Sequence, residues 1–286
     1  KNMITGPIRQ DGPIDHIIKK SGTPTMGGVI IIIGILSSTF LWADLTNVYI
    51  WTLIFVSLSL GGLGLLDDIL KIKFKNSQGL RSRYKFLGQL IISSLALFIL
   101  IKFSDHDYLY DLYFPFFKNF VWYMGLFFIP FGLFVIIGAS NAVNLTDGLD
   151  GLATVPVMLV ALSFTLISYV VGNTIFSEYL KIQYIPDVGE LSIFCGSIVG
   201  ACLGFLWYNA PPAKIFMGDT GSLSLGGSLA AIAIIVKHEI VLAIIGGLFV
   251  LETASVIIQV VSFKLTGKRI FKMAPIHHHF EKKGWA

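Results

Sequence analysis

The chain has 286 residues, of which 55% are hydrophobic and only 13% are charged, and its formal net charge is +4 at pH 7. Soluble domains carry about 25% charged residues. This composition therefore excludes an ordinary soluble enzyme and is typical of a protein embedded in a membrane.

Apolar runs close to the ~20 residues that cross a bilayer as a helix recur along almost the whole chain. Because lipid offers no hydrogen bonds to the backbone, we expect an all-α, polytopic bundle. Eight spans are predicted, near residues 26–42, 48–66, 86–103, 121–139, 152–171, 191–208, 221–236 and 240–263. No room is left for a soluble domain, so residues 1–286 are expected to form a single integral membrane domain.

The positions of lysine and arginine predict which side of the membrane each connection faces. Short loops rich in these residues stay in the cytoplasm. Seventeen of the 21 basic residues lie in the N-terminal segment, the second loop, the loop around Lys214 and the C-terminal tail. These connections also hold the polar, glycine-rich stretches. We therefore expect a functional site that faces the cytoplasm.

The second predicted span ends in two adjacent carboxylates, Asp67 and Asp68, with Lys71 one helical turn beyond. Paired carboxylates can bind a hard cation such as Mg²⁺. They can also repel each other, so that one keeps its proton and serves as a base or nucleophile. A solvated helix end with a local ion pair is the structural alternative.

Four polar side chains follow the fourth span at three-residue intervals, namely Asn141, Asn144, Asp147 and Asp150. On a helix this spacing lines one face, although two glycines indicate that part of the segment is a turn. Amides suit a uracil edge or sugar hydroxyls, and carboxylates suit ribose or a metal ion. Helix capping is the structural alternative.

The next cytoplasmic loop runs from Asn209 to Ser222 and leads directly into a span. Glycines ahead of a helix can offer backbone N–H groups to a phosphate, and Asp219 is a natural Mg²⁺ ligand beside such a phosphate. The run Gly-Asp-Thr-Gly-Ser lacks the ending of a P-loop, and capping of the helix is again the alternative.

Further polar groups lie near the two ends of the chain. Three consecutive histidines, residues 277–279, cannot easily turn toward one metal ion, so hydrogen bonds to a pyrophosphate are favoured over zinc binding. Lys20 and Thr25 precede the first span, where they suit either a phosphate or a simple turn. Glu252 is the one acid inside a span and is expected to pair within the bundle or face water.

Carboxylates that bind Mg²⁺, together with cationic side chains, are typical of phosphoryl-transfer sites, and here they gather at one membrane face. A site at the bilayer boundary can also admit one water-soluble and one lipid substrate. An ion channel or a transporter is the alternative from another class. Transporters place their binding groups near the bilayer midplane, where this sequence has only Glu252.

Six stretches in order along nearly the whole chain resemble the phospho-N-acetylmuramoyl-pentapeptide transferase family, within the polyprenyl-phosphate N-acetylhexosamine-1-phosphate transferases. They are residues 20–28, 66–71, 79–88, 141–151, 209–227 and 273–285. The last contains Ala-Pro-Ile-His-His-His-Phe-Glu, which resembles the peptidoglycan branch. A related enzyme that uses UDP-GlcNAc is the alternative. The resemblance implies ten spans, so the family's first and last spans are expected before Lys1 and after Trp285.

The resemblance implies Mg²⁺-dependent transfer of phospho-MurNAc-pentapeptide from UDP-MurNAc-pentapeptide to undecaprenyl phosphate, giving lipid I and UMP at the cytoplasmic face of the bacterial inner membrane. Membrane lipids are further implied partners, a homodimer is left open, and no nucleic acid is expected. By motif position, Asp219 would bind Mg²⁺, and Asp67, Asp68 and His278 would complete the catalytic set. Substrate contacts would come from Lys20, Thr25, Lys71, Lys85, Asn141, Asn144, Asp147, Asp150, Asn209, Phe216, His277 and His279.

Two mechanisms follow from this assignment. In one, the lipid phosphate attacks directly, with Asp67 assisting its deprotonation. In the other, an aspartate attacks first and forms a covalent phospho-enzyme. Direct attack is favoured, because a phosphate oxygen is already largely ionised at neutral pH.

Overall fold

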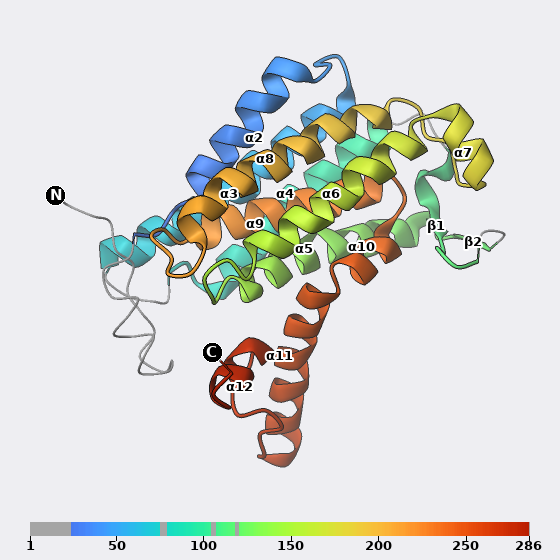
Figure 1. Cartoon of the computed structure of the whole chain (residues 1–286). Coiled ribbons are helices and arrows are strands. Elements are labelled where there is room, and N and C mark those ends of the chain that lie inside the picture. The colour runs from blue at the N-terminus through green and yellow to red at the C-terminus, as the bar shows by residue number, and fades with distance from the viewer. Residues whose placement is uncertain (1–23, 75–78, 104–106, 118–119, 286) are drawn as a thin grey trace.

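The computed structural model describes residues 24–74, 79–103, 107–117 and 120–285. Its helices are α2 (Gly28–Trp42), α3 (Val48–Phe74), α4 (Ser82–Phe103), α5 (Phe128–Thr146), α6 (Thr154–Val171), α7 (Thr174–Leu180), α8 (Leu191–Asn209), α9 (Gly218–Ile235), α10 (Glu239–Ile245), α11 (Gly247–Thr266) and α12 (Ile276–Glu281). The short 3-10 helices are η1 (Asp107–Tyr110), η2 (Gly125–Phe127) and η3 (Val188–Glu190). The long helices lie alongside one another in one bundle (Figure 1).

The predicted helical bundle is confirmed. Among the described residues, seven helices are long and apolar enough to cross a membrane, and α2 is shorter, with 15 residues. Several predicted boundaries differ, and the second span, predicted over residues 48–66, continues as α3 to Phe74. The span predicted from residue 121 begins with strand β2 (Val121–Tyr123), which pairs antiparallel with β1 (Asp111–Tyr113). The last predicted span, 240–263, is two helices that meet at Gly246, where a Cβ would lie 2.7 Å from the carbonyl oxygen of Leu242.

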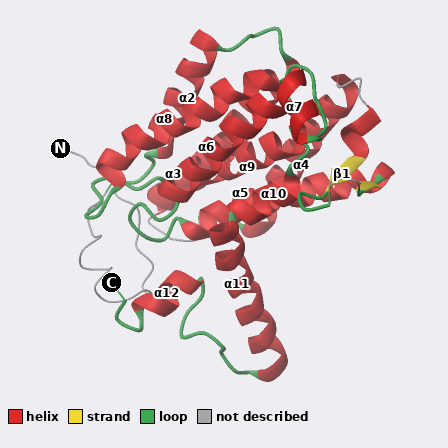
Figure 2. Ribbon diagram, turned by 45° about the vertical axis from the view of Figure 1, so that its right-hand side comes forward, coloured by secondary structure: helices red, strands yellow, loops and turns green. Residues whose placement is uncertain are grey.

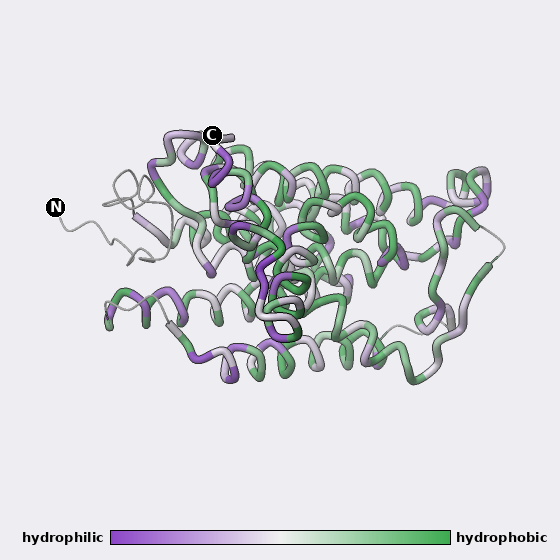
Figure 3. The backbone as a smooth tube through the Cα atoms, turned by 90° about the horizontal axis from the view of Figure 1, so that it is seen from below, coloured by the Kyte–Doolittle hydropathy of each residue, from purple (hydrophilic) through white to green (hydrophobic). Residues whose placement is uncertain are grey.

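The outer surface of the bundle is apolar. Large side chains such as Phe134 on α5 and Leu251 on α11 are 73% and 61% exposed. Figure 3 shows hydrophobic residues along most of the bundle and hydrophilic stretches mainly in the connections. An apolar exterior of this extent is typical of contact with lipid. The protein is therefore a multi-pass membrane protein.

Helix α9 lies at the centre of the bundle, and every residue from Thr220 to Ile235 is buried. Its neighbours come close because glycines form the contacts. A Cβ on Gly28 of α2 would overlap the backbone of Gly221, and a Cβ on Gly64 of α3 would overlap the carbonyl group of Asp219. Close approach through small residues is the usual packing of membrane helices.

Serine hydrogen bonds set the register of α9 against its neighbours. Ser224 donates to the carbonyl of Ser57 on α3 at 2.9 Å, and the two hydroxyls are also 2.9 Å apart. Ser140 on α5 donates to the carbonyl of Leu223 at 3.1 Å. Such bonds between membrane helices contribute about 1 kcal/mol each. They place the end of α3, the end of α5 and the start of α9 at the same end of the bundle.

Helix α11 leaves the bundle, as Figures 1 and 2 both show. Its buried residues are limited to Phe249, Glu252 and Ser255. The short helix α12 follows and lies beside α11. The segment between them returns the three histidines toward the bundle.

Replacing Gly64 by alanine is expected to destabilise the protein, because the new Cβ would overlap the carbonyl group of Asp219 and backbone atoms cannot easily move aside. Overpacking of this kind costs about 1–3 kcal/mol. Thermal unfolding of the detergent-purified variant should therefore occur at a lower temperature than in the unmodified protein. Gly62→Ala is the matched control, since a Cβ there has nothing within 4 Å. Equal melting temperatures for the two variants would contradict the proposed contact.

Candidate active site

Three carboxylates meet between the C-terminal part of α3 and the first turn of α9. Asp67 and Asp68 lie on α3, and Asp219 lies in the first turn of α9. One carboxylate oxygen from each lies within 4.8 Å of the other two. Asp67 and Asp68 are 2% and 3% exposed. We call these three residues the carboxylate cluster. A group of this kind could hold a divalent cation, since carboxylate oxygens are hard ligands.

Two lysines neutralise much of the cluster's charge. The ammonium of Lys71 lies 2.6 Å from Asp67 Oδ2, 2.9 Å from Asp219 Oδ2 and 3.5 Å from Asp68 Oδ1. Lys85, in the first turn of α4, lies 2.5 Å from Asp219 Oδ2. Carboxylates this deeply buried need charged partners. An ammonium in contact with all three carboxylates indicates a place that favours a cation.

Asp68 is held by the start of α9. Its Oδ2 accepts hydrogen bonds from the backbone N–H of Thr220 at 3.0 Å and from the Thr220 hydroxyl at 2.8 Å. Its Oδ1 accepts one from the N–H of Asp219 at 3.3 Å. Asp68 thus satisfies N–H groups that the first turn of a helix leaves unpaired. Sequence reasoning missed Thr220, although its place beside Asp219 at the start of a helix is the signal that could have found it.

The loop ahead of α4 covers Asp67. The backbone N–H of Leu80 donates to Asp67 Oδ1 at 2.7 Å. Gly79 has φ +55°, and a Cβ there would lie 2.7 Å from the same oxygen. Both the backbone conformation and the lack of space therefore require glycine at this position.

Asn144 connects α5 to the carboxylate cluster. Its amide donates to Asp219 Oδ1 at 2.9 Å and to the Ser222 hydroxyl at 2.8 Å. Asp219 therefore has one oxygen on the amide of Asn144 and the other on the two lysines. This arrangement fixes the orientation of the Asp219 carboxylate.

The polar face predicted over residues 141–150 is divided between a helix and a turn, as the glycines indicated. Helix α5 ends at Thr146, and a turn follows. Asn141 lies deeper in the bundle, where it donates to Gln89 Oε1 at 3.0 Å. Asp147 accepts a hydrogen bond from the N–H of Gly218 at 3.2 Å, which ties the turn to the start of α9. We call residues 146–150 the α5 turn.

Asp150 and Asn209 hold two loops together. Asp150 accepts a hydrogen bond from the N–H of Ala213 at 2.9 Å. Asn209, 2% exposed, accepts from the Thr154 hydroxyl at 2.7 Å and donates to the carbonyl of Ile215 at 3.0 Å. These bonds hold the loop of residues 209–215 beside the α5 turn. The substrate contacts predicted for Asp150 and Asn209 stay predictions.

Phe216 and Thr25, two further residues of the predicted site, lie close to the start of α9. The backbone N–H of Phe216 donates to the carbonyl of Pro24 at 2.9 Å. A Cβ on Gly218 would lie 3.0 Å from the Thr25 hydroxyl, so Thr25 is beside the first turn of α9. Lys20 lies outside the described residues.

Two of the three histidines bind within their own segment. His278 Nδ1 lies 2.6 Å from Glu281 Oε2. His279 Nδ1 accepts a hydrogen bond from the backbone N–H of Lys272 at 3.0 Å. Desolvation, together with the charges of Lys283 and Lys272, lowers the pKa of His279, which agrees with a neutral ring that accepts a hydrogen bond.

The first histidine faces the bundle instead. His277 Nδ1 lies 3.1 Å from Glu252 Oε2 of α11. The other edge of the ring lies against the α5 turn, where a Cβ on Gly148 would overlap Nε2. The three imidazoles therefore have three different partners.

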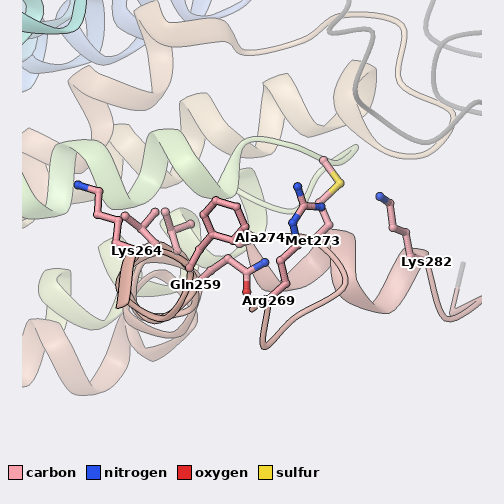
Figure 4. Close-up of a pocket in the computed structure, with 9 residues that line it drawn as sticks. Gln259, Lys264, Arg269, Met273, Ala274 and Lys282 are labelled. Carbon is pink, nitrogen blue, oxygen red and sulfur yellow. The ribbon is translucent and has the colours of Figure 1, made fainter. Parts of the chain in front are cut away.

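Two pockets flank this region. A pocket of about 620 Å³ lies beside the segment that joins α11 to α12, and its lining includes Gln259, Lys264, Arg269, Met273, Ala274 and Lys282 (Figure 4). An apolar groove of about 330 Å³ lies against α5, α9, α10 and α11, and its lining includes Gly138, Ala142, Val143, Leu229, Phe249 and Ile257. Ala142 and Val143 directly precede Asn144 on α5, so the groove reaches toward the carboxylate cluster.

Comparison with known proteins identifies the family. Residues 50–237 match the sequence profile of glycosyl transferase family 4, and residues 20–32 match phospho-N-acetylmuramoyl-pentapeptide-transferase signature 1. A phospho-N-acetylmuramoyl-pentapeptide-transferase of Pelagibacter ubique is 66% identical over 283 residues, which are 99% of this chain and 78% of the relative. The chain belongs to the phospho-N-acetylmuramoyl-pentapeptide-transferase family.

A second relative of the same name, from Rhodopseudomonas palustris, is 57% identical over 280 residues, which are 98% of this chain and 77% of the relative. The resemblance predicted from the six sequence stretches is therefore confirmed. Family membership also decides between a transferase and a transporter, and the protein is a transferase.

Asp219→Asn is expected to weaken divalent-cation binding by about tenfold or more, because it removes the negative charge from a carboxylate of the cluster and keeps its shape. The probe is Mn²⁺, whose free concentration can be read by electron paramagnetic resonance in a titration of the purified protein. Asp150→Asn is the control with the same charge change, since Asp150 binds Ala213 and lies outside the cluster. Unchanged Mn²⁺ affinity in Asp219→Asn would rule out a cation site at Asp219.

Proposed function

We propose that this protein transfers phospho-MurNAc-pentapeptide from UDP-MurNAc-pentapeptide to undecaprenyl phosphate, giving lipid I and UMP in peptidoglycan synthesis. The observation that carries this proposal is the carboxylate cluster with its two lysines, at one end of a membrane bundle, in a chain of this family. The names of both relatives describe transferases of phospho-N-acetylmuramoyl-pentapeptide.

The reaction proceeds by direct attack of the lipid phosphate. One of its oxygens forms a bond to the phosphorus that bears the MurNAc sugar. The bond from this phosphorus to the bridging oxygen breaks, and that oxygen leaves with UMP and takes the bonding electron pair. A phosphate oxygen is already ionised at neutral pH, so positioning and charge neutralisation matter more than a strong base.

The partners of Asp68 argue against this residue as the nucleophile of a covalent phospho-enzyme. Asp68 uses both oxygens to hold the start of α9. A nucleophile needs a free lone pair aimed at phosphorus. We therefore assign Asp68 to the positioning of Asp219, and Asp67, through its ion pair, to the positioning of Lys71.

We propose Mg²⁺ as the cation, with Asp219 as its principal ligand. The donor set fits, because three carboxylates converge on one point and the ammonium of Lys71 touches all of them. When bound, Mg²⁺ supplies neutralisation of the charge on the pyrophosphate. Asn144 holds Asp219 in orientation, and Lys85 stays within reach of the substrate phosphates.

The apolar groove is the proposed site of the polyprenyl chain. It is bounded by four helices, and aliphatic and aromatic side chains make up most of its lining. An isoprenoid chain has no polar group to satisfy, so it can lie along such a surface while its phosphate reaches the end of α5. The groove thus leads along α5 toward Asn144, which binds Asp219 of the carboxylate cluster.

The pocket beside the α11–α12 connection is the proposed site of the peptide part of the donor. Lys264, Arg269 and Lys282 bring three positive charges to it, and Val256, Val260 and Phe263 add an apolar base. Free carboxylates of a peptide bind well to such cations. The pocket borders Ala274, close to the histidine that faces the α5 turn.

We place this site at the cytoplasmic face of the bacterial inner membrane, since the basic connections hold the site residues and such loops stay in the cytoplasm. Residues 1–286 are proposed to act as one integral membrane domain surrounded by membrane lipids.

The unmodified protein is expected to release UMP from UDP-MurNAc-pentapeptide only when Mg²⁺ and undecaprenyl phosphate are both present. UMP release can be followed by chromatography, and the lipid product by mass spectrometry. Asp219→Ala should abolish turnover, because it removes the principal ligand of the cation.

Three outcomes would contradict the assignment. UMP release that does not need the lipid would make the protein a hydrolase. Faster turnover of UDP-GlcNAc than of UDP-MurNAc-pentapeptide would favour the related GlcNAc-1-phosphate transferases. Substantial activity in Asp219→Ala would overturn the metal assignment.

Gly138→Leu is expected to raise the KM for undecaprenyl phosphate by about tenfold and to leave the KM for the nucleotide donor unchanged. Gly138 lines the groove, and a Cβ there has nothing within 4 Å, so leucine would fill space proposed for the chain. Gly200→Leu on the exposed face of α8 is the control, because a Cβ there also has nothing within 4 Å and Gly200 is not among the groove residues. An equal effect of both variants would argue against the groove.

A further inference from the structure

Glu252 is a buried acid whose partner is a histidine from another segment. It lies on α11 and is 1% exposed. Its Oε2 lies 3.1 Å from His277 Nδ1 and accepts a weaker hydrogen bond from the His277 backbone N–H at 3.4 Å. A buried carboxylate is costly unless it is paired, so this contact accounts for Glu252.

The second nitrogen of the same ring has no such partner. His277 Nε2 is buried, and no hydrogen-bond partner for it exists within the described residues. It lies against Gly148, where a Cβ would overlap it. Buried polar atoms are nearly always hydrogen-bonded, which makes this nitrogen a candidate for a bond to a ligand.

The position of Nε2 indicates which ligand. Gly148 belongs to the α5 turn, between Asp147, which holds the start of α9, and Asp150, which holds the loop at Ala213. The carboxylate cluster adjoins this turn through Asn144. A group bonded to Nε2 would therefore lie beside the cluster, where the proposed function places the nucleotide-activated donor.

The carboxylate also determines which nitrogen carries the proton. When Nδ1–H donates to Glu252, the neutral ring presents Nε2 as an acceptor. A ring without this partner could turn about its side-chain bonds or take the other tautomer. Glu252 therefore fixes both the orientation and the hydrogen-bonding character of His277.

We propose that Glu252 is a positioning residue of the transfer reaction, which holds His277 by Nδ1 so that Nε2 accepts a hydrogen bond from a hydroxyl or N–H group of the donor's nucleoside. This inference rests on the proposed function. Since His277 is 7% exposed, the α5 turn has to shift when the nucleoside binds.

The test compares the unmodified full chain with Glu252→Leu, Glu252→Gln and His277→Leu in the UMP-release assay. Glu252→Leu and His277→Leu should each raise the KM for UDP-MurNAc-pentapeptide by about tenfold, the effect of losing one hydrogen bond of about 1.4 kcal/mol. The KM for undecaprenyl phosphate should not change. Glu252→Gln should retain most of the donor affinity, because its amide oxygen still accepts from Nδ1–H.

A double-variant experiment distinguishes the positioning role of Glu252 from a role in packing alone. The effects of Glu252→Leu and His277→Leu on the donor KM should be strongly non-additive in the double variant, because both remove the same oriented nitrogen. Glu281→Leu is the matched control, since Glu281 makes the equivalent contact with His278 on the same helix. Its effect should add to that of His277→Leu.

A binding measurement tests the role of Glu252 without relying on catalysis. Titration of the purified variants with UMP should show affinity about tenfold weaker in Glu252→Leu than in Glu252→Gln, with equal melting temperatures. Three results would overturn the positioning role. They are an equal donor KM in Glu252→Leu and Glu252→Gln, parallel changes in the KM values for donor and lipid, and an unchanged donor KM in His277→Leu. Failure of the unmodified protein to transfer to the lipid would overturn the proposed function, while the UMP titration would still test Glu252.

Discussion

The close packing of α9 against its neighbours is the constraint on which the rest of the structure depends. This helix is buried on all sides from Thr220 onward. Its first turn is therefore enclosed by α2, α3 and α5. Gly28 and Gly64 allow the backbones to touch at that turn. A larger side chain at either position would separate the helices and move Asp219 away from its partners.

Charge at the edge of a membrane bundle is stable only when it is balanced, and this requirement explains the composition of the site. Three carboxylates share two ammonium groups, and Asp68 also binds N–H groups at the start of α9. The same arrangement suits phosphoryl transfer, because a cation and two lysines gathered at one point can neutralise the charge of a pyrophosphate. Stability and chemistry thus rest on the same ionic contacts.

The C-terminal segment joins the site by a different route. Helix α11 leaves the bundle, and α12 lies beside it, so that one histidine reaches the α5 turn. Glu252 on α11 holds that histidine at its other nitrogen. The return of the chain also forms the basic pocket at Arg269 and Lys282, next to the histidines. A departure from the regular bundle therefore creates the part of the site that we assign to donor recognition.

The sequence by itself determined the helical class, the apolar segments that form the bundle, the family and the stretches from which the site is built. Hydropathy and motif spacing are properties of neighbouring residues, so they are visible without a fold. Only the tertiary structure decided which side chains meet. Asp68 binds Thr220 across 152 positions, and Glu252 binds His277 across 25. Such pairs depend on which helices pack together and in what register, and no local pattern carries that information. For the same reason, the sequence did not predict that Asn209 and Asp150 hold two loops together. It also did not predict the break at Gly246 within one expected span.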